Sequence, residues 1–460
     1  MARGCAQCSV KENEYRSNPK SSGQNALVLR TMAIVVAAAV AGACSLPGGG
    51  GPTGTFKIGV DLPLSGAEAA VGVPALEGVR FYVRQHPTLA GFNVELVVKD
   101  DATAGVVEPV TGAGNVQALA SDPLVVGVIG PLDSSVARAE IPVANQASLA
   151  MVSPATSSPC LTRDDYLPAA LSTSRAPITC EQAGVTRASD LRPSGVNNYF
   201  RLATTDDLQG PAAADFAYRD LHLLRIATVA DGEGYGEALA AGFATRFRAA
   251  GGSIVGRLDL GASPAPDMAA FLKKMKADGA QAVYFGGIAS NHGCALRAEM
   301  AAVFDPGEAA PLLGGDGIAQ DPACLQDAGT NAAGIYATVP VPNAADLVGA
   351  RPAIAAFKAA YPKPADFGLF TMLAYDAAAV LYIAIERAIK ASAGGLPPRG
   401  NVISQLSALQ NFPGVTGELG FDPKGDTTRR VVSVFESPGP DAAAPWKPAG
   451  QIDYSGALPS

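Results

Sequence analysis

Charge, aromatic residues and histidine are all scarce in this 460-residue chain. Charged residues make up 17% of it and aromatic residues 6%, and there are only one tryptophan and three histidines. The formal net charge is −8, so the sequence lacks the basic excess that binds nucleic acid or an anionic membrane surface. His86, His222 and His292 lie far apart without metal-site spacing, so no metal is expected.

The signatures of several enzyme classes are also missing. The sequence contains no H-E-x-x-H, G-x-S-x-G or G-x-x-x-x-G-K-[ST] segment, so it lacks the residues of metalloproteases, α/β-hydrolases and P-loop enzymes. An oxidoreductase on a Rossmann-like fold would need a dinucleotide fingerprint after its first strand. Pro63–Gly72 (P-L-S-G-A-E-A-A-V-G) does not supply one. We therefore expect a binding protein without a cofactor rather than an enzyme.

A long apolar run occurs near the N-terminus. Met32–Ala43 is shorter than the roughly 20 residues that span a bilayer and fits the core of a signal peptide. Small residues precede Cys44, which resembles a bacterial lipobox, although that motif usually has Leu where this chain has Ala41. We expect 1–43 to be a leader, Cys44 to carry a lipid and 44–55 to be a flexible tether. Ordinary secretion with cleavage nearby is the alternative.

Four of the seven cysteines follow the predicted leader and Cys44. Four cysteines allow three pairings. We favour Cys160–Cys180 and Cys294–Cys324 because each pair closes a local loop between turn-rich segments. Such bridges would indicate an oxidising compartment; four buried free thiols are the alternative.

Apolar strands and amphipathic helices alternate along the chain. In the first part, strands are predicted at Phe56–Leu62, Val94–Val98, Val125–Ile129 and Met151–Ser153, with helices at Pro74–Gln85 and Val106–Ala120. A second alternation starts at Gln209, with strands at Arg225–Val229, Ser253–Leu258, Ala282–Phe285, Pro311–Leu313 and Tyr336–Val339. This pattern indicates α/β architecture with parallel sheets covered on both faces.

Three stretches would carry the chain between two lobes, near 203–209, 338–342 and 426–431. The first lobe is predicted to comprise residues 56–205 and 340–427, and the second 206–339 and 428–460. The apolar helix Phe370–Ala391 is expected to be a core element; the charged residues that interrupt it argue against a membrane span.

Motifs in collinear order carry a family resemblance. They are I-G-V-D-L-P-L-S-G at 58–66, V-I-G-P-L-D-S-S at 128–135, V-S-P-A-T-S-S-P at 152–159, F-R-L-A-T-T-D-D-L-Q-G-P at 200–211 and L-L-G-G-D-G at 312–317. Together with further blocks up to about residue 437, this pattern resembles the type I periplasmic substrate-binding proteins. Within them it is most similar to the branched-chain amino-acid (Leu/Ile/Val) receptors of ABC transporters.

The resemblance implies two Rossmann-like α/β lobes joined by a three-strand hinge that closes around a ligand. It implies a monomeric, lipid-anchored extracytoplasmic receptor that delivers an amino acid, or a similar small polar molecule, to an ABC permease. A receptor that senses a short amide or urea-like ligand for signalling is the alternative.

The resemblance also assigns candidate ligand-binding residues in the first lobe. Ser134, at the expected start of a helix, would bind the ligand carboxylate. Ala155 would offer its carbonyl to the ammonium, and Ser157 its N–H and hydroxyl to the carboxylate, with Thr156 able to share that role. Each of these residues could instead be serving only as helix cap or turn residue.

In the second lobe, Asp316 would pair with the ligand ammonium and Tyr235 would close over the ligand. An Asp-Gly turn is the simpler interpretation of Asp316. Ile288 stands where the family often has a tyrosine, so one second-lobe contact is lost. Asp100 and Asp101 are interpreted as supports of the nearby loop.

One segment departs from the family pattern. About forty residues lie between Pro159 and Tyr199 where a short connection is usual, and Cys160 and Cys180 both fall within them. This 160–198 insertion begins beside the predicted ligand loop. It either covers the cleft or runs out on the solvent side.

Overall fold

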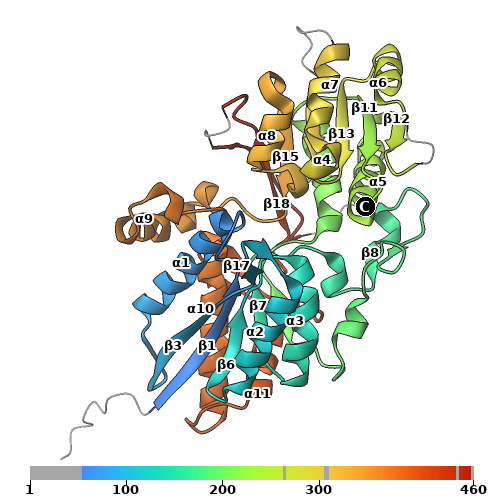
Figure 1. Cartoon of the computed structure of the whole chain (residues 1–460). Helices are drawn as coiled ribbons and strands as arrows, with labels where there is room; N and C mark the ends of the chain where they lie inside the picture. Colours follow the sequence, from blue (N-terminus) through green and yellow to red (C-terminus); the bar gives the residue numbers. More distant parts are fainter. Residues whose placement is uncertain (1–53, 263–265, 305–309, 442–444, 457–460) are drawn as a thin grey trace, which may run out of the picture. The chain divides into compact units, whose positions relative to one another are not determined.

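Two sheets organise the part of the chain that the computed structural model describes, which comprises residues 54–262, 266–304, 310–441 and 445–456. The predicted leader, Cys44 and most of the tether lie outside these residues. The first sheet has the strand order β10-β7-β6-β1-β3-β2, and the second has β12-β11-β13-β14-β15-β18-β19 (Figure 1). Helices flank both sheets, as the alternation predicted.

The first sheet is parallel except for its edge strand β2. Its elements are β1 Gly54–Leu62, α1 Ala69–Gln85, β2 Thr88–Leu89, β3 Phe92–Asp100, α2 Pro109–Ser121, β6 Val125–Ile129, α3 Ser134–Gln146, β7 Ala150–Ser153 and β10 Tyr199–Arg201. A small hairpin of β4 (Ala102–Thr103) and β5 (Val106–Val107) precedes α2, so that helix starts later than predicted. Helix α1 starts earlier than predicted, with Pro74 inside it.

A later segment completes the first lobe with α9 Arg351–Ala360, α10 Thr371–Ala391, α11 Arg399–Ser407, β16 Phe412–Gly414 and β17 Gly417–Leu419. Helix α10 packs into the same core as β1. The buried carboxylate of Asp376 on α10 accepts hydrogen bonds from the backbone N–H groups of Val415 (2.9 Å) and Thr416 (2.8 Å). A charged residue is thereby accommodated within a core helix. No helix in the described part of the chain combines the length and apolarity needed to cross a membrane.

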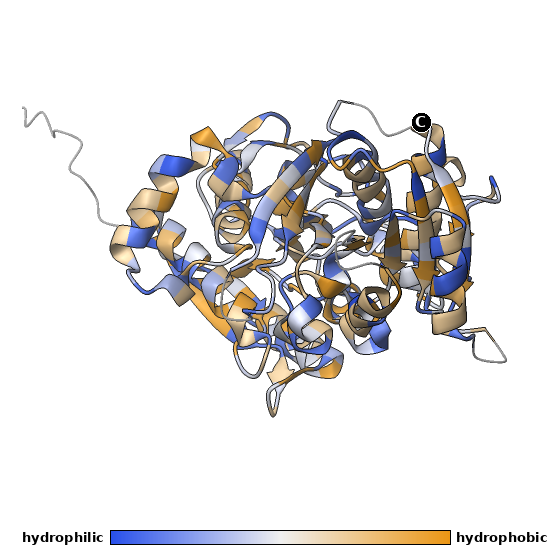
Figure 2. Cartoon of the chain, turned by 90° about the horizontal axis from the view of Figure 1, so that it is seen from above, coloured by the Kyte–Doolittle hydropathy of each residue, from blue (hydrophilic) through white to orange (hydrophobic). Residues whose placement is uncertain are grey.

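The second sheet is parallel from β12 to β15 and antiparallel beyond it. Its elements are α4 Gln209–Arg219, β11 Arg225–Ala230, α5 Gly234–Ala249, β12 Ser253–Asp259, α6 Met268–Ala277, β13 Ala282–Gly286, α7 Ala295–Val303, β14 Leu312–Gly314, α8 Pro322–Ala328, β15 Ile335–Val339, β18 Val431–Glu436 and β19 Lys447–Asp453. The two antiparallel strands at its edge were not predicted. Figure 2 shows apolar colouring along the strands and mixed colouring on the helices around them.

The three predicted crossings between the lobes lie side by side. The backbone N–H of Thr204 donates to the carbonyl of Pro340 at 2.7 Å, and the Thr204 hydroxyl donates to the carbonyl of Val431 at 3.1 Å. One residue of the first crossing is therefore bonded to both of the others, which confirms the three-strand hinge.

Both predicted disulfides are present: Cys160 is joined to Cys180, and Cys294 to Cys324. All four cysteines are buried. The pairing favoured from local loop closure is confirmed, and the alternative of four free thiols is wrong.

Candidate functional site

The first-lobe half of the site lies where β6 and β7 end. Asp133 caps helix α3, its Oδ1 accepting from the N–H groups of Ser135 (2.6 Å) and Val136 (3.3 Å). Ser134 is therefore the first helical residue rather than the cap. Its hydroxyl accepts from the backbone N–H of Ser158 at 3.3 Å, which ties the start of α3 to the loop after β7.

The loop after β7 is shaped by Ser153, a residue that the sequence did not single out. Its hydroxyl donates to the carbonyl of Pro131 at 2.7 Å and accepts from the N–H groups of Ala155 (3.2 Å) and Thr156 (3.0 Å). The Thr156 side chain is buried, and its hydroxyl contacts those of Ser153 and Tyr199. The structure thus gives Thr156 partners inside the protein, and its predicted share in ligand binding stays a prediction.

Ser157 connects this loop to the hinge. Its carbonyl accepts from the backbone N–H of Asp206 at 2.9 Å. Asp206 begins the short 3-10 helix η4 (Asp206–Leu208), which leads into α4. The first-lobe loop therefore meets a buried acidic residue at the first crossing.

Tyr235 and Asp316, each predicted as a second-lobe ligand contact, lie side by side. The Tyr235 hydroxyl donates to Asp316 Oδ1 at 2.5 Å and accepts from the backbone N–H of Gly317 at 3.1 Å. Tyr235 comes from the start of α5, and Asp316 from the 3-10 helix η6 (Asp316–Ile318) after β14. Parallel strands β11 and β14 end at the same edge of the sheet, which explains why these two loops meet.

Gln209 connects the carboxylates of Asp206 and Asp316, a role that was not predicted from the sequence. Its fully buried amide donates to Asp316 Oδ1 (2.8 Å) and Asp206 Oδ1 (2.9 Å). Its carbonyl oxygen accepts from the Asp316 N–H (3.0 Å) and the Thr338 hydroxyl (3.1 Å). The T-T-D-D-L-Q-G segment was recognised as a family block, but its place beside Asp316 becomes visible only in the fold.

The two carboxylates form an electrostatic site for a cation. Burial, and then the charge of Asp316, raise the pKa of Asp206 to about 7. Burial also raises the pKa of Asp316, although hydrogen bonds from Tyr235 and Gln209 act to lower it. Two desolvated carboxylates that repel each other are stabilised by a positive group placed between them. The arrangement suits the ammonium of an amino acid.

A cavity of about 500 Å³ adjoins Asp316, within the size range of small-molecule sites. Its walls combine the start of α1, the turn before α10 and the Asp316 loop. They include Glu68, Val71, Ala319, Asp321, Val339, Leu369 and Phe370. Ile288, which is 41% exposed, lies against Gly317 beside the cavity wall, where the family often has a tyrosine.

Asp100 supports the loop that leads to this cavity, as predicted. Its Oδ1 accepts from the backbone N–H groups of Leu64 (2.8 Å) and Ala102 (3.0 Å). Asp101 differs, because neither of its buried side-chain oxygens has a hydrogen-bond partner among the described residues. Burial, together with the charge of Asp61, raises the pKa of Asp101 to about 7. The prediction is confirmed for Asp100; no hydrogen bond gives the Asp101 carboxylate the same role.

The insertion contacts both lobes. Its 3-10 helices η1 (Pro159–Leu161) and η3 (Ala188–Leu191) pack on α3, and its strand β8 (Asp165–Leu167) and 3-10 helix η2 (Ala169–Leu171) pack on α5. Strand β8 pairs with β9 (Ile178–Thr179), and β8 lies beside α5 in Figure 1. Residues 173–177 and 193–196 of the insertion are exposed, and whether the insertion covers the cleft stays a prediction.

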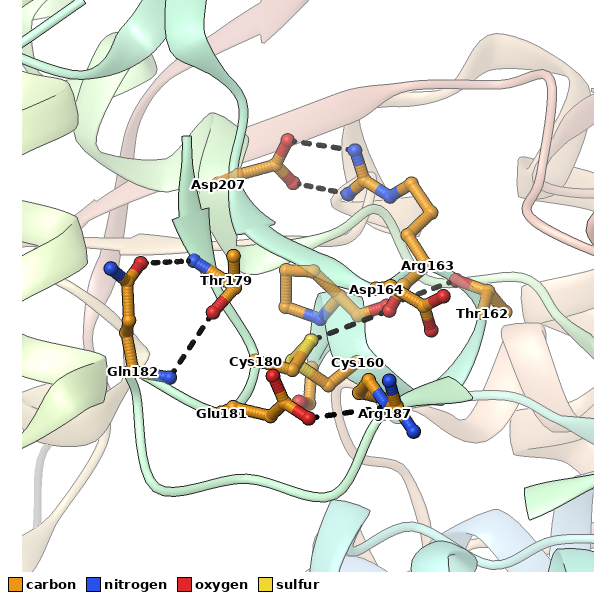
Figure 3. Close-up of a disulfide and its surroundings, with 12 residues drawn as sticks. Cys160, Thr162, Arg163, Asp164, Thr179, Cys180, Glu181, Gln182, Arg187 and Asp207 are labelled. Carbon is orange, nitrogen blue, oxygen red and sulfur yellow. Dashed lines mark hydrogen bonds and ion pairs between the residues drawn. A yellow bond between two sulfur atoms is a disulfide. The ribbon is translucent and has the colours of Figure 1, made fainter. Parts of the chain in front are cut away.

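Arg163 fixes the insertion to the hinge (Figure 3). Its guanidinium forms paired hydrogen bonds with Asp207 (2.8 and 3.2 Å) and a third with the Thr205 hydroxyl (3.0 Å). It also lies 3.7 Å from the carboxylate of Asp426. Arg163 thus joins the first crossing to the third.

Two α/β lobes joined by three crossings, with polar groups of both lobes gathered where they meet, define the class of two-lobed solute-binding proteins. Comparison with known sequences agrees, since the periplasmic binding protein family model matches residues 55–439. The chain belongs to that family.

Relatives and solved structures indicate the branch. The Leu/Ile/Val-binding protein homolog 3 of Brucella melitensis is 27% identical over 387 residues, which cover 83% of this chain and 91% of the relative. A leucine-, isoleucine-, valine-, threonine- and alanine-binding protein of Pseudomonas aeruginosa is 30% identical over 54% of this chain and 62% of its own length. The crystal structure of the leucine-binding protein LivK of Thermotoga maritima superposes with a TM-score of 0.61 at 25% identity, covering 86% of this chain and 99% of that one. The family resemblance inferred from the sequence is confirmed.

Proposed function

We propose that this protein is an extracytoplasmic solute-binding lipoprotein of an ABC importer that captures a free amino acid between its lobes. The observation that carries the proposal is the pair Asp206 and Asp316, joined by Gln209 and set beside the loops of Ser134 and Ser157. The carboxylates would receive the ligand ammonium, while the α3 N-terminus and the Ser157 hydroxyl would receive its carboxylate.

The walls of the cavity support a ligand with a small or medium side chain. Val71, Leu369 and Phe370 offer apolar surface, while Glu68 and Asp321 line the same space. Asp316 is one methylene shorter than the glutamate that the family carries at the corresponding position, and Ile288 leaves out an aromatic contact. We therefore expect this protein to bind its ligand in a slightly different position from that in the Leu/Ile/Val receptors.

Isothermal titration calorimetry tests this function directly. Amino acids are expected to bind, and nucleotides are not; binding of nucleotides alone would refute the proposal. Ser134→Ala and Asp316→Ala should each weaken binding by about 1–3 kcal/mol, because each removes a partner of a ligand charge. Ser135→Ala is the matched control, since only the backbone of this exposed neighbour is used. Equal affinity of all three variants and the wild type would contradict the assigned site.

Transport and anchoring need separate tests. Genes for a permease and an ATPase beside this one would support import, whereas a ligand response to amides or urea without such genes would favour the signalling alternative. Metabolic labelling with a fatty acid should mark the wild-type protein and not Cys44→Ala. Labelling of both proteins alike would contradict Cys44 as the lipidated residue.

A further inference from the structure

The cavity beside Asp316 is lined by charges of one sign. The carboxylates of Glu68, Asp316 and Asp321 line it, and no lysine, arginine or histidine of the described residues does. None of the three carboxylates forms an ion pair with a described residue. Like charges gathered around one cavity repel each other, so a cationic ligand group is favoured there.

Asp316 already has a role in the proposed function, since it would receive the ligand ammonium. Its side-chain hydrogen bonds come from the neutral groups of Tyr235 and Gln209, so no cation of the protein cancels its charge. A single ammonium at Asp316 would leave the carboxylates of Glu68 and Asp321 without a cationic partner. The lining of the cavity therefore favours a ligand with a second positive group.

Glu68 and Asp321 are both available to such a group. Glu68 directly precedes helix α1, and its side chain makes no hydrogen bond with the described residues. Asp321 precedes α8 and uses only Oδ1, which accepts from the backbone N–H of Ala323 at 2.8 Å, so its Oδ2 has no partner there. Glu68 is exposed and Asp321 is half-buried, so a ligand that enters from solvent can reach both carboxylates.

The two carboxylates belong to different lobes. Glu68 lies in the first lobe, whereas Asp321 lies in the second, five residues after Asp316. Two negative charges that approach each other as the lobes close oppose that motion, and a cation between them reverses the sign of the interaction. A cationic ligand group would thus stabilise the closed form more than the open one.

The apolar part of the same cavity fits the rest of such a ligand. Val71, Leu369 and Phe370 line it together with the carboxylates. A flexible methylene chain can pack on apolar surface while its charged end stays among polar groups, as lysine side chains do in proteins. The volume of about 500 Å³ leaves room for an unbranched side chain of this kind.

We propose that Glu68 and Asp321 are specificity-determining residues that select an amino acid whose side chain ends in a cation, with the length of ornithine or lysine. The α-ammonium pairs with Asp316, the methylene chain packs on the apolar wall, and the terminal cation lies between Glu68 and Asp321. This inference rests on the proposed function and names the class of amino acid within it.

Calorimetry on the whole protein compares L-lysine and L-ornithine with L-norleucine, which keeps the methylene chain of lysine and lacks its terminal charge. The wild type should bind lysine or ornithine at least about 10-fold more tightly than norleucine. Glu68→Gln and Asp321→Asn should each reduce this preference about 5- to 10-fold and change norleucine affinity less than twofold, because each removes only a charge. Asparagine at position 321 still caps α8, which protects the fold.

Matched controls remove carboxylates from equivalent positions outside the cavity. Glu108 precedes α2 without capping it, and Asp267 caps α6 by accepting from the N–H of Ala270 at 2.9 Å. Glu108→Gln and Asp267→Asn should bind all three amino acids as the wild type does. If the wild type binds norleucine as tightly as the cationic amino acids, or if either Glu68→Gln or Asp321→Asn keeps the full preference, this inference is wrong while the proposed function stands. If the wild type binds no amino acid, both fail.

Discussion

Replacing Asp426, in the third crossing, by Asn should lower the free energy of unfolding more than breaking any exposed ion pair. Arg201 is completely buried, and its Nε donates to Asp426 Oδ1 at 2.7 Å. The same guanidinium donates to the carbonyl of Ser158 at 2.7 Å and to the Thr162 hydroxyl at 2.5 Å. These neutral partners cannot balance its charge once the carboxylate is removed.

The expected cost follows from the burial of this pair. Removing one partner of a buried ion pair typically costs about 3–5 kcal/mol, because the remaining charge stays desolvated. An exposed i,i+4 pair contributes only about 0.3–0.5 kcal/mol. Glu386→Gln, which breaks the exposed Glu386–Lys390 pair, is therefore the matched control.

Urea unfolding of the oxidised protein measures both changes as shifts in the free energy of unfolding. Burial acts to raise the pKa of Asp426, but Arg201 and Arg163 hold it below its ordinary value. The stabilising contribution is thus complete above the ordinary pKa of about 4 and is lost as the pH falls through the lowered pKa. Asp426→Asn should remove this part of the acid dependence. A loss no larger than that of Glu386→Gln would refute the reasoning.

Three further predictions concern the site and the insertion. Thr156→Val should lower the free energy of unfolding by about 1–3 kcal/mol through lost buried hydrogen bonds, yet change ligand affinity less than twofold; a large loss of affinity measured by calorimetry would instead make Thr156 a ligand contact. Cys160→Ser combined with Cys180→Ser should cost about 3 kcal/mol in urea unfolding, and an unchanged midpoint would contradict a stabilising disulfide. Amino-acid affinity should fall below pH 7 by up to about tenfold per unit, because a bound ammonium favours ionised Asp206 and binding then releases a proton; Asp206→Asn should flatten this profile.

The parts of the fold that depend on local pattern could be predicted from the sequence. The alternation of apolar strands with helices predicted the two mainly parallel sheets. The local loop that each cysteine pair closes predicted both disulfides. The start of α1 at Ala69 was missed, because the helix was predicted from the periodicity of its apolar residues after Pro74, and the proline lies inside the helix. The antiparallel strands β18 and β19 were missed because their pairing with β15 is a long-range contact.

The candidate site was predicted only in part, for similar reasons. Tyr235 and Asp316 were predicted as second-lobe ligand contacts because the family blocks that contain them are recognisable, but the hydrogen bond between them was not predicted. Gln209 was missed because its role depends on reaching the carboxylate of Asp316, which lies 107 residues further along the chain. The position of the insertion could not be predicted, because a proline-rich segment without periodicity is placed by what it packs against.

The interleaved connectivity of the lobes has a consequence for biosynthesis. Strand β18, which pairs with β15 in the second sheet, is synthesised only after helix α10. Helix α10 belongs to the first lobe, where its Leu381 packs against Gly127 of β6. Neither lobe can therefore complete its fold before the later segments are synthesised, even though domains commonly fold in the order of their synthesis. Expression of the first stretch of either lobe without its second stretch should yield aggregating material. Co-expression of two fragments divided in the α9–α10 connection offers a route to reassembly.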